Sequence, residues 1–482
     1  MKIIELHEYI EDTASLFDLV ADQPWSQYLD SGVSYGPSEA EKGVDILVCK
    51  PQSILLTFGE ETEHYGPAEY QDGEGRALLS TSEENPFQLL KQLLLDYEIA
   101  GDLSYSDSEG NERGLPFWGG AIGYFGYELA RQLEELPQHA LDDIGLPDMA
   151  IGIYETAVIS CHREKKSWFI DVTGKNPKLK EFWLNHINSI DYSQKELIDI
   201  SHAWKTVGEM QTALSREDYG FKFEKIQRYL KEGDCYQINL TNRFDVPVSG
   251  NAWHSYLKMR SMSMAPFGAY MNFPCAQVLS NSPERFIECV DGKVKTSPIK
   301  GTRPRDLDIL ERDLALAYEL EASEKDQAEN VMIVDLLRND LGRVCEIGSV
   351  KVPELFAIET YANVHHMVSH VEGELREGIH SLDLLEASFP GGSITGAPKK
   401  RAMEIIDELE PFCRGVYCGA IGWVDFAGNM QTNIAIRTIA TVDGRSYFSA
   451  GGGIVIDSDE EDEYQELLSK AAIMLKTIGV NQ

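Results

Sequence analysis

The 482-residue sequence lacks any apolar run near the roughly 20 residues that a membrane-spanning helix needs. Its first residues, MKIIELHEYIEDTASLF, are acidic, whereas a signal peptide begins with a basic segment followed by an apolar one. We therefore expect a cytoplasmic protein with no membrane partner. Its hydrophobic share of 43% is enough for a large buried core.

Basic side chains are also scarce, because 43 lysines and arginines stand against 79 aspartates and glutamates. The formal net charge of −36 gives a surface that repels nucleic acid, which excludes nucleic acid as a main partner. High solubility or a salty habitat would each account for this acidity. An anionic ligand would need a locally positive site, built from a few cationic side chains, backbone N–H groups and a metal ion.

Motifs for common cofactors and disulfide frameworks are missing as well. The eight cysteines are scattered, with no CxxC pair and no Cys/His cluster at metal-ligand spacing, so we expect reduced thiols. Neither a Walker A loop nor a GxGxxG segment after a strand is present. Nucleotide binding therefore has no support.

The chain divides into three segments by pattern. Residues 1–160 combine short β-like runs with one helical stretch and predict an N-terminal lobe, while residues 161–214 are polar and helix-prone, as in a connecting segment. Residues 215–478 alternate short strands with long helices and hold most of the unusual residues. This mixture predicts an α+β fold, with antiparallel sheet and helices packed outside it.

The segments SPERF and SPIKGTRPR carry the strongest chemical signal, an acid and a lysine on either side of a hairpin. If residues 290–292 form a three-residue loop, Glu284 lies diagonal to Lys300 on the same face, which is the arrangement we predict. A two-residue Asp-Gly turn would put the two on opposite faces. A carboxyl group near a lysine amine suits acid/base and nucleophilic catalysis, whereas a surface cross-strand pair is the alternative.

Two glutamates on separate helices are candidate metal ligands. Glu329 begins the apolar helix ENVMIVDLLRND, and Glu466 lies in EDEYQELLSK with Lys470 one turn later. Such a pair suits Mg²⁺, which takes one or two protein carboxylates together with waters and substrate oxygens. Taken alone, each glutamate reads as a solvated helix residue.

Several polar and glycine-rich segments could bind an anion. The free backbone N–H groups of Gly396 and Ala397 directly precede a helix and could bind a carboxylate. Gly452 and Gly453 lie in a second segment that could form such a concave site, and the guanidinium group of Arg437 could bind a carboxylate through two hydrogen bonds. Together they predict a site for a ligand with two carboxylates. The strand CYQINLTNRF puts its polar residues, Gln237 among them, on one face that either meets solvent or lines a cavity. His366 could carry a proton, orient a substrate oxygen or be structural.

At these residues the chain resembles the chorismate-utilising enzymes, the family of anthranilate synthase, isochorismate synthase and aminodeoxychorismate synthase component I. The resemblance is most specific over Glu217–Ala472, in SPERF, PIKGT, AENVMIVDLLRNDLGR, GGSITGAPK, IAIRT, AGGGIV and YQE, and weaker before residue 160. It implies two antiparallel sheets packed face to face with helices outside, and a site at one end of the cleft. Chorismate is a dianion, which agrees with the expected locally positive site.

The resemblance also implies roles for the residues. Lys300 would attack C2 of Mg²⁺-bound chorismate and expel the 4-hydroxyl group, with Glu284 as the acid, before ammonia attacks C4 and releases the lysine. Glu329 and Glu466 would hold Mg²⁺. The residues expected to bind substrate are Thr395, Gly396, Ala397, Tyr417, Arg437, Gly452, Gly453, Lys470 and Gln237.

Two positions sort the branches of this family. Anthranilate and isochorismate synthases usually carry alanine in place of Lys300, and water-using members carry a lysine in place of Gln237. Both residues favour amination at C4, which yields 4-amino-4-deoxychorismate for 4-aminobenzoate and folate synthesis. The alternatives are anthranilate synthase component I, which releases pyruvate, and a catalytically inactive effector-binding subunit.

The resemblance implies partners too. The chain has no glutamine amidotransferase nucleophile loop, so a separate glutamine amidotransferase subunit is expected to supply ammonia in a heterodimer. Relatives also hold tryptophan in the N-terminal lobe, which would place it at Ser31 and at Pro266, Phe267 and Gly268. The segment Val33–Gly43 departs from the pattern expected of such a site.

Overall fold

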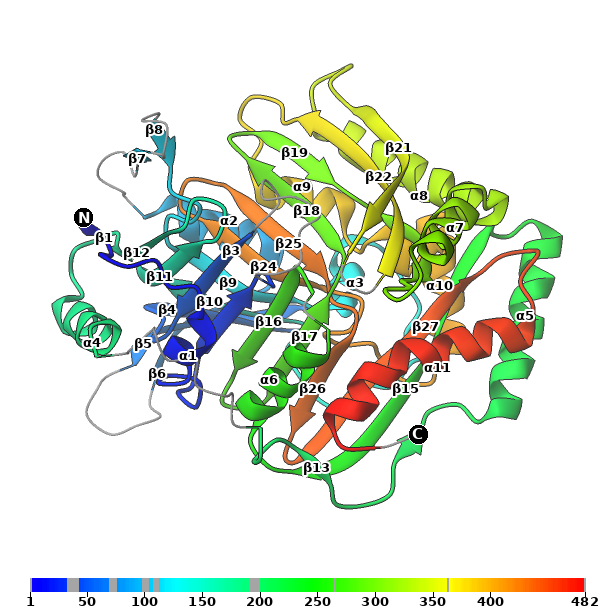
Figure 1. Cartoon of the computed structure of the whole chain (residues 1–482), viewed down its shortest axis with the longest axis horizontal. Helices are drawn as coiled ribbons and strands as arrows, with labels where there is room; N and C mark the ends of the chain where they lie inside the picture. The colour runs from blue at the N-terminus through cyan, green and yellow to red at the C-terminus, as the bar shows by residue number, and fades with distance from the viewer. Residues whose placement is uncertain are drawn as a thin grey trace.

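Two large antiparallel sheets, packed face to face, form the centre of the computed structural model (Figure 1). The structure describes residues 2–32, 43–68, 76–97, 104–106, 112–189, 200–263, 265–361 and 364–480. Helices cover the outer sides of both sheets. The predicted α+β class with two face-to-face sheets is therefore confirmed.

The first sheet has 13 strands in the described residues and joins strands from both ends of the chain. Their order is β1 (Lys2–Glu5), β12 (Lys166–Asp171), β11 (Thr156–Cys161), β3 (Val44–Val48), β2 (Ser26–Asp30), β16 (Phe267–Asn272), β17 (Gln277–Ser282), β26 (Thr438–Val442), β27 (Arg445–Ile454), β15 (Gln237–Ser249) and β13 (Lys205–Thr206). The short strands β14 (Gln211–Thr212) and β23 (Gly396–Ala397) also pair with β15.

The second sheet has 12 strands in the same described ranges. Their order is β20 (Ile299–Pro304), β22 (Val364–Glu374), β19 (Lys293–Thr296), β18 (Arg285–Val290), β25 (Met430–Ile434), β24 (Ala420–Asp425), β9 (Gly120–Phe125), β10 (Met149–Tyr154), β4 (Ser53–Phe58), β5 (Glu61–Ala68) and β6 (Arg76–Ser82), with β21 (Lys351–Thr360) beside β22. A small hairpin, β7 (Ser104–Ser106) and β8 (Glu112–Gly114), stands apart. Since each sheet mixes N-terminal and C-terminal strands, the boundaries at residues 160 and 214 stay a prediction.

Helices complete the outer layers. The first sheet is covered by α1 (Thr13–Phe17), α4 (Pro177–Ile187), α5 (Arg216–Glu232), α6 (Ala252–Met262), α10 (Lys399–Leu409) and α11 (Glu460–Thr477). The second sheet carries α2 (Pro86–Leu95), α3 (Ala130–Leu133), α7 (Leu310–Glu321), α8 (Glu324–Gly342) and α9 (Ser381–Ser388). The short 3-10 helices are η2 (Tyr127–Leu129) and η3 (Gly392–Ile394).

Local chemistry explains where the helices begin and end. Helix α5 begins at a capping box, in which Ser215 and Asp218 satisfy each other's backbone N–H groups, and ends at Gly233 in the left-handed conformation. Helix α11 begins where the Asp459 side chain accepts from the next free N–H groups. These caps fix where the two helices lie on the first sheet.

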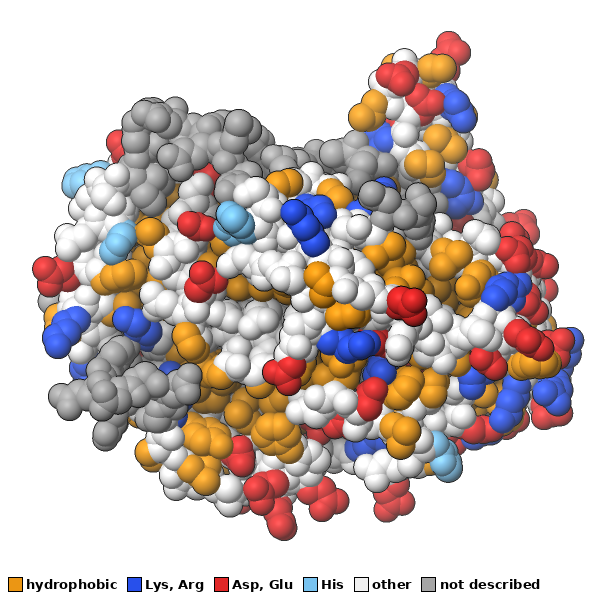
Figure 2. Space-filling view, turned by 90° about the horizontal axis from the view of Figure 1, so that it is seen from below, with side chains coloured by type: hydrophobic (Ala, Val, Ile, Leu, Met, Phe, Trp, Pro, Cys, Tyr) orange, Lys and Arg blue, Asp and Glu red, His pale blue; other side chains and the backbone are white. Residues whose placement is uncertain are grey.

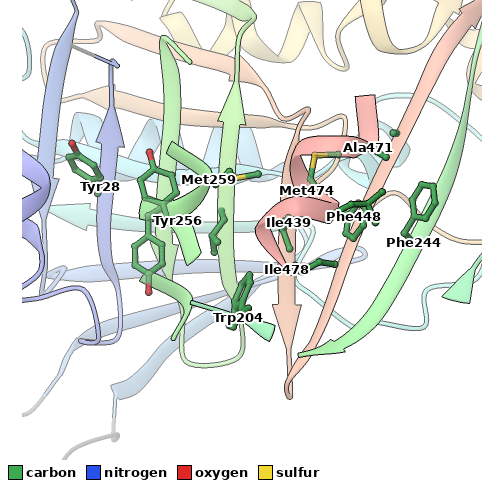
Figure 3. Packing of buried hydrophobic residues seen from close by; sticks show 14 of the residues in the cluster. Tyr28, Trp204, Phe244, Tyr256, Met259, Ile439, Phe448, Ala471, Met474 and Ile478 are labelled. Carbon is green, nitrogen blue, oxygen red and sulfur yellow. The ribbon is translucent and has the colours of Figure 1, made fainter. Parts of the chain in front are cut away.

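Apolar residues fill the space under these helices and between the sheets. Under α6 and α11, aromatic and aliphatic side chains interleave, with Phe244 and Phe448 stacked at a centroid distance of 5.3 Å (Figure 3). Between the sheets, Tyr154 donates to the carbonyl of Trp25 at 2.7 Å, so one sheet is tied to the other. This rigid sandwich holds the ends of the strands that carry the site.

The outer surface matches the acidic composition. Acidic side chains are scattered over the face seen in Figure 2, with lysines and arginines interspersed. Within the described ranges, none of the helices combines the length and the apolar character required to cross a membrane.

Candidate active site

The hairpin between β18 and β19 does not have the predicted three-residue loop. Val290 pairs with Lys293, and Asp291 and Gly292 have φ angles of 50° and 75°, which makes a two-residue turn. The prediction was wrong because an Asp-Gly pair accepts two successive positive φ angles. Continued regularly, this register would put Glu284 and Lys300 on opposite faces.

Irregularities in the two strands restore the predicted proximity. The register shifts between Arg285 and Ile287 on β18 and between Ile299 and Thr302 on β20, where Gly301 has a φ of +79°. Such bulges re-aim side chains relative to a regular strand. Lys300 is among the charges that act on Glu284, so the acid and the lysine share one site.

Glu284 is suited to carry a proton. Its side chain is buried, and burial raises the pKa of the carboxyl group above its usual range, against the opposing effects of Ser393, Lys300 and other cations. A carboxyl group of this kind keeps its proton closer to neutral pH. It can therefore act as an acid toward a leaving group.

The two predicted metal ligands meet around Lys300. The Glu329 carboxylate, from α8, lies 4.0 Å from Lys300 Nζ. Burial alone would raise the pKa of Glu466, on α11, but Lys470 at 2.6 Å, Lys300 and Lys325 together hold it below its usual range. Carboxylates from α8 and α11 thus converge, as the separate-helix prediction requires.

A third carboxylate in this cluster was missed by sequence reasoning. Glu463 is buried, accepts from Ser458 Oγ at 2.7 Å and lies 3.7 Å from Lys325 Nζ. Burial, with the nearby charge of Glu466, raises the pKa of its carboxyl group. The signal in the sequence was the three-residue spacing from Glu466, which puts both side chains on one helix face.

The cluster fits a divalent cation by its donor chemistry. A Cβ added to Gly452 would lie 3.0 Å from Glu463 Oε2 and 3.7 Å from Glu466 Oε1, so the glycine keeps the space between these carboxylates open. No group of three His, Cys, Asp or Glu side chains in the described residues is arranged to hold a metal alone. Mg²⁺ needs only one or two protein carboxylates, so these residues suit it.

Gln237 lies beside the neighbouring glycine, Gly453. It is fully buried on β15, and within the described chain neither its side-chain oxygen nor its nitrogen has a hydrogen-bond partner. Its strand neighbours Asn239 and Thr241 are also buried and bond to Ile394 O and to Glu410. The polar face of this strand therefore lies in the interior, and Gln237 has unused bonding capacity there.

We expect Gly453→Ala to damage this site, because a Cβ there would lie 2.9 Å from the Gln237 amide. The crowding should lower turnover about tenfold or more and cost roughly 1–3 kcal/mol of stability. Steady-state kinetics and urea unfolding would measure both. Gly342→Ala, where nothing lies within 4 Å of the added carbon, is the matched control. Equal behaviour of the two variants would contradict this packing.

The predicted anion-binding residues flank Gln237. Strand β23, formed by Gly396 and Ala397, pairs with β15 at Gln237 and Ile238. Thr395 is buried, and its hydroxyl group donates a hydrogen bond to Gly391 O at 3.0 Å. Their substrate contacts stay predictions.

Three further residues were predicted to bind substrate. Arg437, with a φ of 50°, contributes positive charge at both Glu284 and His366. Tyr417 is buried, and burial holds the pKa of its hydroxyl well above the usual range, so it remains a neutral donor. Lys470 also donates to Gly451 O at 3.0 Å, beside the two site glycines.

His366 lies at the edge of the site on β22. Its Nδ1 is 2.9 Å from Thr302 Oγ1, and its ring meets Tyr361 edge-on. Burial and then Arg437 lower the pKa of His366 to about 4. A neutral imidazole at physiological pH favours orientation of a substrate oxygen over proton delivery by an imidazolium.

This low pKa predicts a pH effect on stability. The unfolded chain takes up a proton near pH 6.5 and the folded chain only near pH 4, so stability should fall as pH falls through this window. The loss attributable to His366 would approach roughly 3 kcal/mol. Urea unfolding across pH should give a flatter profile for His366→Gln than for the wild type or for the exposed control His202→Gln. Parallel profiles would contradict the assignment.

The predicted tryptophan residues also come together. Gly268 pairs with Asp30 across β16 and β2, which places Pro266–Gly268 next to Ser31. The backbone N–H and hydroxyl of Ser31 both donate to Asp45 Oδ1, at 2.8 and 2.7 Å. Residues 33–42 of the segment that departs from the expected pattern lie outside the described residues. Tryptophan binding stays a prediction.

Comparisons with known proteins identify the relatives of this chain. A family model described as chorismate binding enzyme matches residues 57–476. The chain is 45% identical over 96% of its length to aminodeoxychorismate synthase component 1 of Escherichia coli K12, of which it covers 95%. It is 38% identical over 82% of its length to anthranilate synthase component 1 of Acetivibrio thermocellus, of which it covers 80%.

A solved structure gives the same result for the fold. The crystal structure of anthranilate synthase component I from Streptococcus pneumoniae TIGR4 superimposes with a TM-score of 0.74 at 30% identity, over 89% of this chain and 92% of that one. The two-sheet fold is therefore shared with that enzyme.

Proposed function

The chain belongs to the family of chorismate-binding enzymes, and from this membership we propose that it aminates chorismate to 4-amino-4-deoxychorismate. The observation that carries the proposal is Lys300, whose amine lies 4.0 Å from Glu329 and whose charge acts on Glu466 and on the buried acid Glu284. The overall reaction joins chorismate and ammonia and releases water. Two relatives, 45% and 43% identical to this chain, are named aminodeoxychorismate synthase component 1.

The first half of the reaction would use Lys300 and Glu284. The Lys300 amine forms a bond to C2 of chorismate, the ring double bonds shift, and the C4–O bond breaks. Glu284, whose burial raises the pKa of its carboxyl group, would give its proton to the departing hydroxyl group, which leaves as water. Lys300 must be neutral to attack, so its proton passes to solvent before the bond forms.

The second half would return the enzyme to its starting state. Ammonia forms a bond to C4, the double bonds shift back, and the C2–N bond to Lys300 breaks with its electron pair passing to the lysine amine. The ammonium group formed at C4 then returns a proton to Glu284. Gln237, with free donor and acceptor atoms, and the neutral His366 would orient the ring and its oxygen substituents. The enolpyruvyl group stays on the product, because no step breaks its C–O bond.

Mg²⁺ bound by Glu329 and Glu466 would neutralise the substrate carboxylate and polarise the ring for attack. Glu463, which faces Gly452 together with Glu466, would act on the ion through water. Arg437 and Lys470 supply positive charge for the second carboxylate. These roles are consistent with a dianionic ligand in a strongly acidic protein.

Anthranilate synthesis is the second candidate, because relatives of that name match at 38% identity. That route adds ammonia at C2 and eliminates pyruvate, and it needs no lysine nucleophile. The position of Lys300 between Glu284 and Glu329 favours the first reaction.

A partner subunit follows from the source of nitrogen. We propose a glutamine amidotransferase subunit that forms a heterodimer with this chain and releases ammonia to it, with the product feeding 4-aminobenzoate and folate synthesis. The eight cysteines are all free thiols, which supports a reducing cytoplasmic setting.

Pyruvate release distinguishes the two candidates. The purified chain would be incubated with chorismate, Mg²⁺ and an ammonium salt, while lactate dehydrogenase and NADH report pyruvate. We expect chorismate to be consumed without pyruvate. Release of one pyruvate per chorismate would overturn the proposal in favour of anthranilate synthesis.

A further inference from the structure

Helix α7 is attached to the protein by charged groups. Of its side chains, only Asp313 and Leu320 are buried. Asp313 accepts from Arg305 Nε at 2.8 Å and lies 3.0 Å from His365 Nε2. The inner face of the helix is thus held mainly by an ionic cluster, on the outside of the second sheet beside β22 (Figure 1).

The outer face of α7 is apolar. Leu310, Leu314 and Tyr318 recur every four residues, so they form one stripe, and they are 71%, 49% and 67% exposed. Leu307 and Ile309 extend this stripe at the start of the helix. An ordinary surface helix has the reverse pattern, with its apolar side buried. The arrangement is therefore that of a surface made to meet another protein.

We propose that this α7 stripe, made of Leu307, Ile309, Leu310, Leu314 and Tyr318, is the docking surface for the glutamine amidotransferase subunit. The inference rests on the proposed function, which requires such a subunit. The inference adds the location on this chain at which that subunit binds.

Charge identifies the kind of partner. Exposed carboxylates border the stripe, from Asp308, Glu311, Glu319 and Glu321, while Arg312 is paired with Asp306. A second copy of this chain would bring the same acidic border against it, in a protein whose net charge is −36. The complementary surface is an apolar centre with a basic rim. A stable interface buries roughly 800 Å² on each side, so the partner must reach this rim.

The position of helix α7 relative to the active site favours the subunit that supplies ammonia as its partner. Helix α7 packs on β20, the strand that carries Lys300. A Cβ added at Gly301 would lie 2.7 Å from Leu320 Cδ1, so nothing separates the helix from the strand at this point. A subunit docked on the outer face of α7 would release ammonia one helix away from the strand where it reacts.

The test compares two nitrogen sources in one enzyme. The full chain, Leu314→Asp and Leu310→Asp/Leu314→Asp would be mixed with the glutamine amidotransferase subunit from the same genome. Rates with glutamine and with ammonium chloride would be measured, and binding would be followed by calorimetry. Ile347→Asp, at a fully exposed isoleucine outside the stripe, is the matched control.

We expect the stripe variants to bind the subunit at least tenfold more weakly and to lose glutamine-dependent turnover, while their ammonium-dependent turnover stays within twofold of wild type. Unchanged binding and glutamine use in the double variant would overturn the proposal. Equal loss of both activities would also overturn it, since α7 would then serve the active site itself. A wild type without ammonium-dependent turnover would instead refute the proposed function.

Discussion

Replacing Lys300 with alanine should lower the rate of chorismate amination by roughly 10³-fold or more, because the covalent route loses its nucleophile. Substrate binding should change less, since Arg437, Lys470 and the glutamate cluster remain. The measurement is the ammonium-dependent turnover of the purified variant, followed by chromatography of chorismate and product. Lys300→Arg keeps the positive charge beside Glu329 without a nucleophilic amine, and we expect it to be as inactive.

Matched controls separate this effect from damage to the hairpin. Lys293→Ala removes an exposed lysine from β19 and should retain full activity. Thermal unfolding should show similar stability for all three variants, since Lys300 makes one long ion pair at 4.0 Å. Full amination by Lys300→Ala would remove the covalent route, and with it the reason to prefer amination at C4.

The second large effect is expected at the metal cluster. Glu329→Gln and Glu466→Gln each remove one charge from the group that faces Lys300, so the Mg²⁺ concentration for half-maximal activity should rise at least about tenfold. Calorimetric titration of Mg²⁺ into the resting protein should weaken in parallel, which gives a readout apart from turnover. Glu463→Gln should produce a smaller shift, because we expect it to act through water.

Glu324→Gln is the control for these variants, because it removes an exposed carboxylate from the first turn of the same helix, α8. Its Mg²⁺ titration should match that of the wild type. If Glu329→Gln titrates like this control, then Glu329 is not a ligand, and Glu463 together with Glu466 becomes the pair to test.

Patterns that repeat along the chain predicted the framework well. The sequence predicted helices at ENVMIVDLLRND (α8), directly after Ala397 (α10) and around Glu466 (α11), and the short alternating runs predicted strands. Helix α7 was not predicted. It buries an aspartate and exposes leucines, so its periodicity gives no sign of which side faces the protein.

The site was predicted only where residue type alone carries information. Glu284 and Lys300 were paired correctly, but through a turn that the chain does not form. Their real proximity comes from bulges, which depend on packing against β22 and β25 and leave no trace in hydropathy. Glu463 was missed because EDEYQE offers several acids, and only tertiary structure selects the one that faces Gly452.

The polar face of β15 shows the same limit. Alternation placed Gln237, Asn239 and Thr241 on one side, yet it could not say whether this side meets solvent. The answer came from η3 and the end of α10, which are distant in sequence and cover the face with carbonyl and carboxylate acceptors. Burial of a polar strand is decided by such non-local partners.

The central claim is that this chain adds ammonia at C4 of chorismate and keeps the enolpyruvyl group. The most direct test is mass spectrometry of the product formed by the wild-type chain from chorismate, Mg²⁺ and isotopically labelled ammonium. The account predicts a labelled 4-amino-4-deoxychorismate that retains its pyruvyl carbons. Labelled anthranilate together with free pyruvate would contradict it.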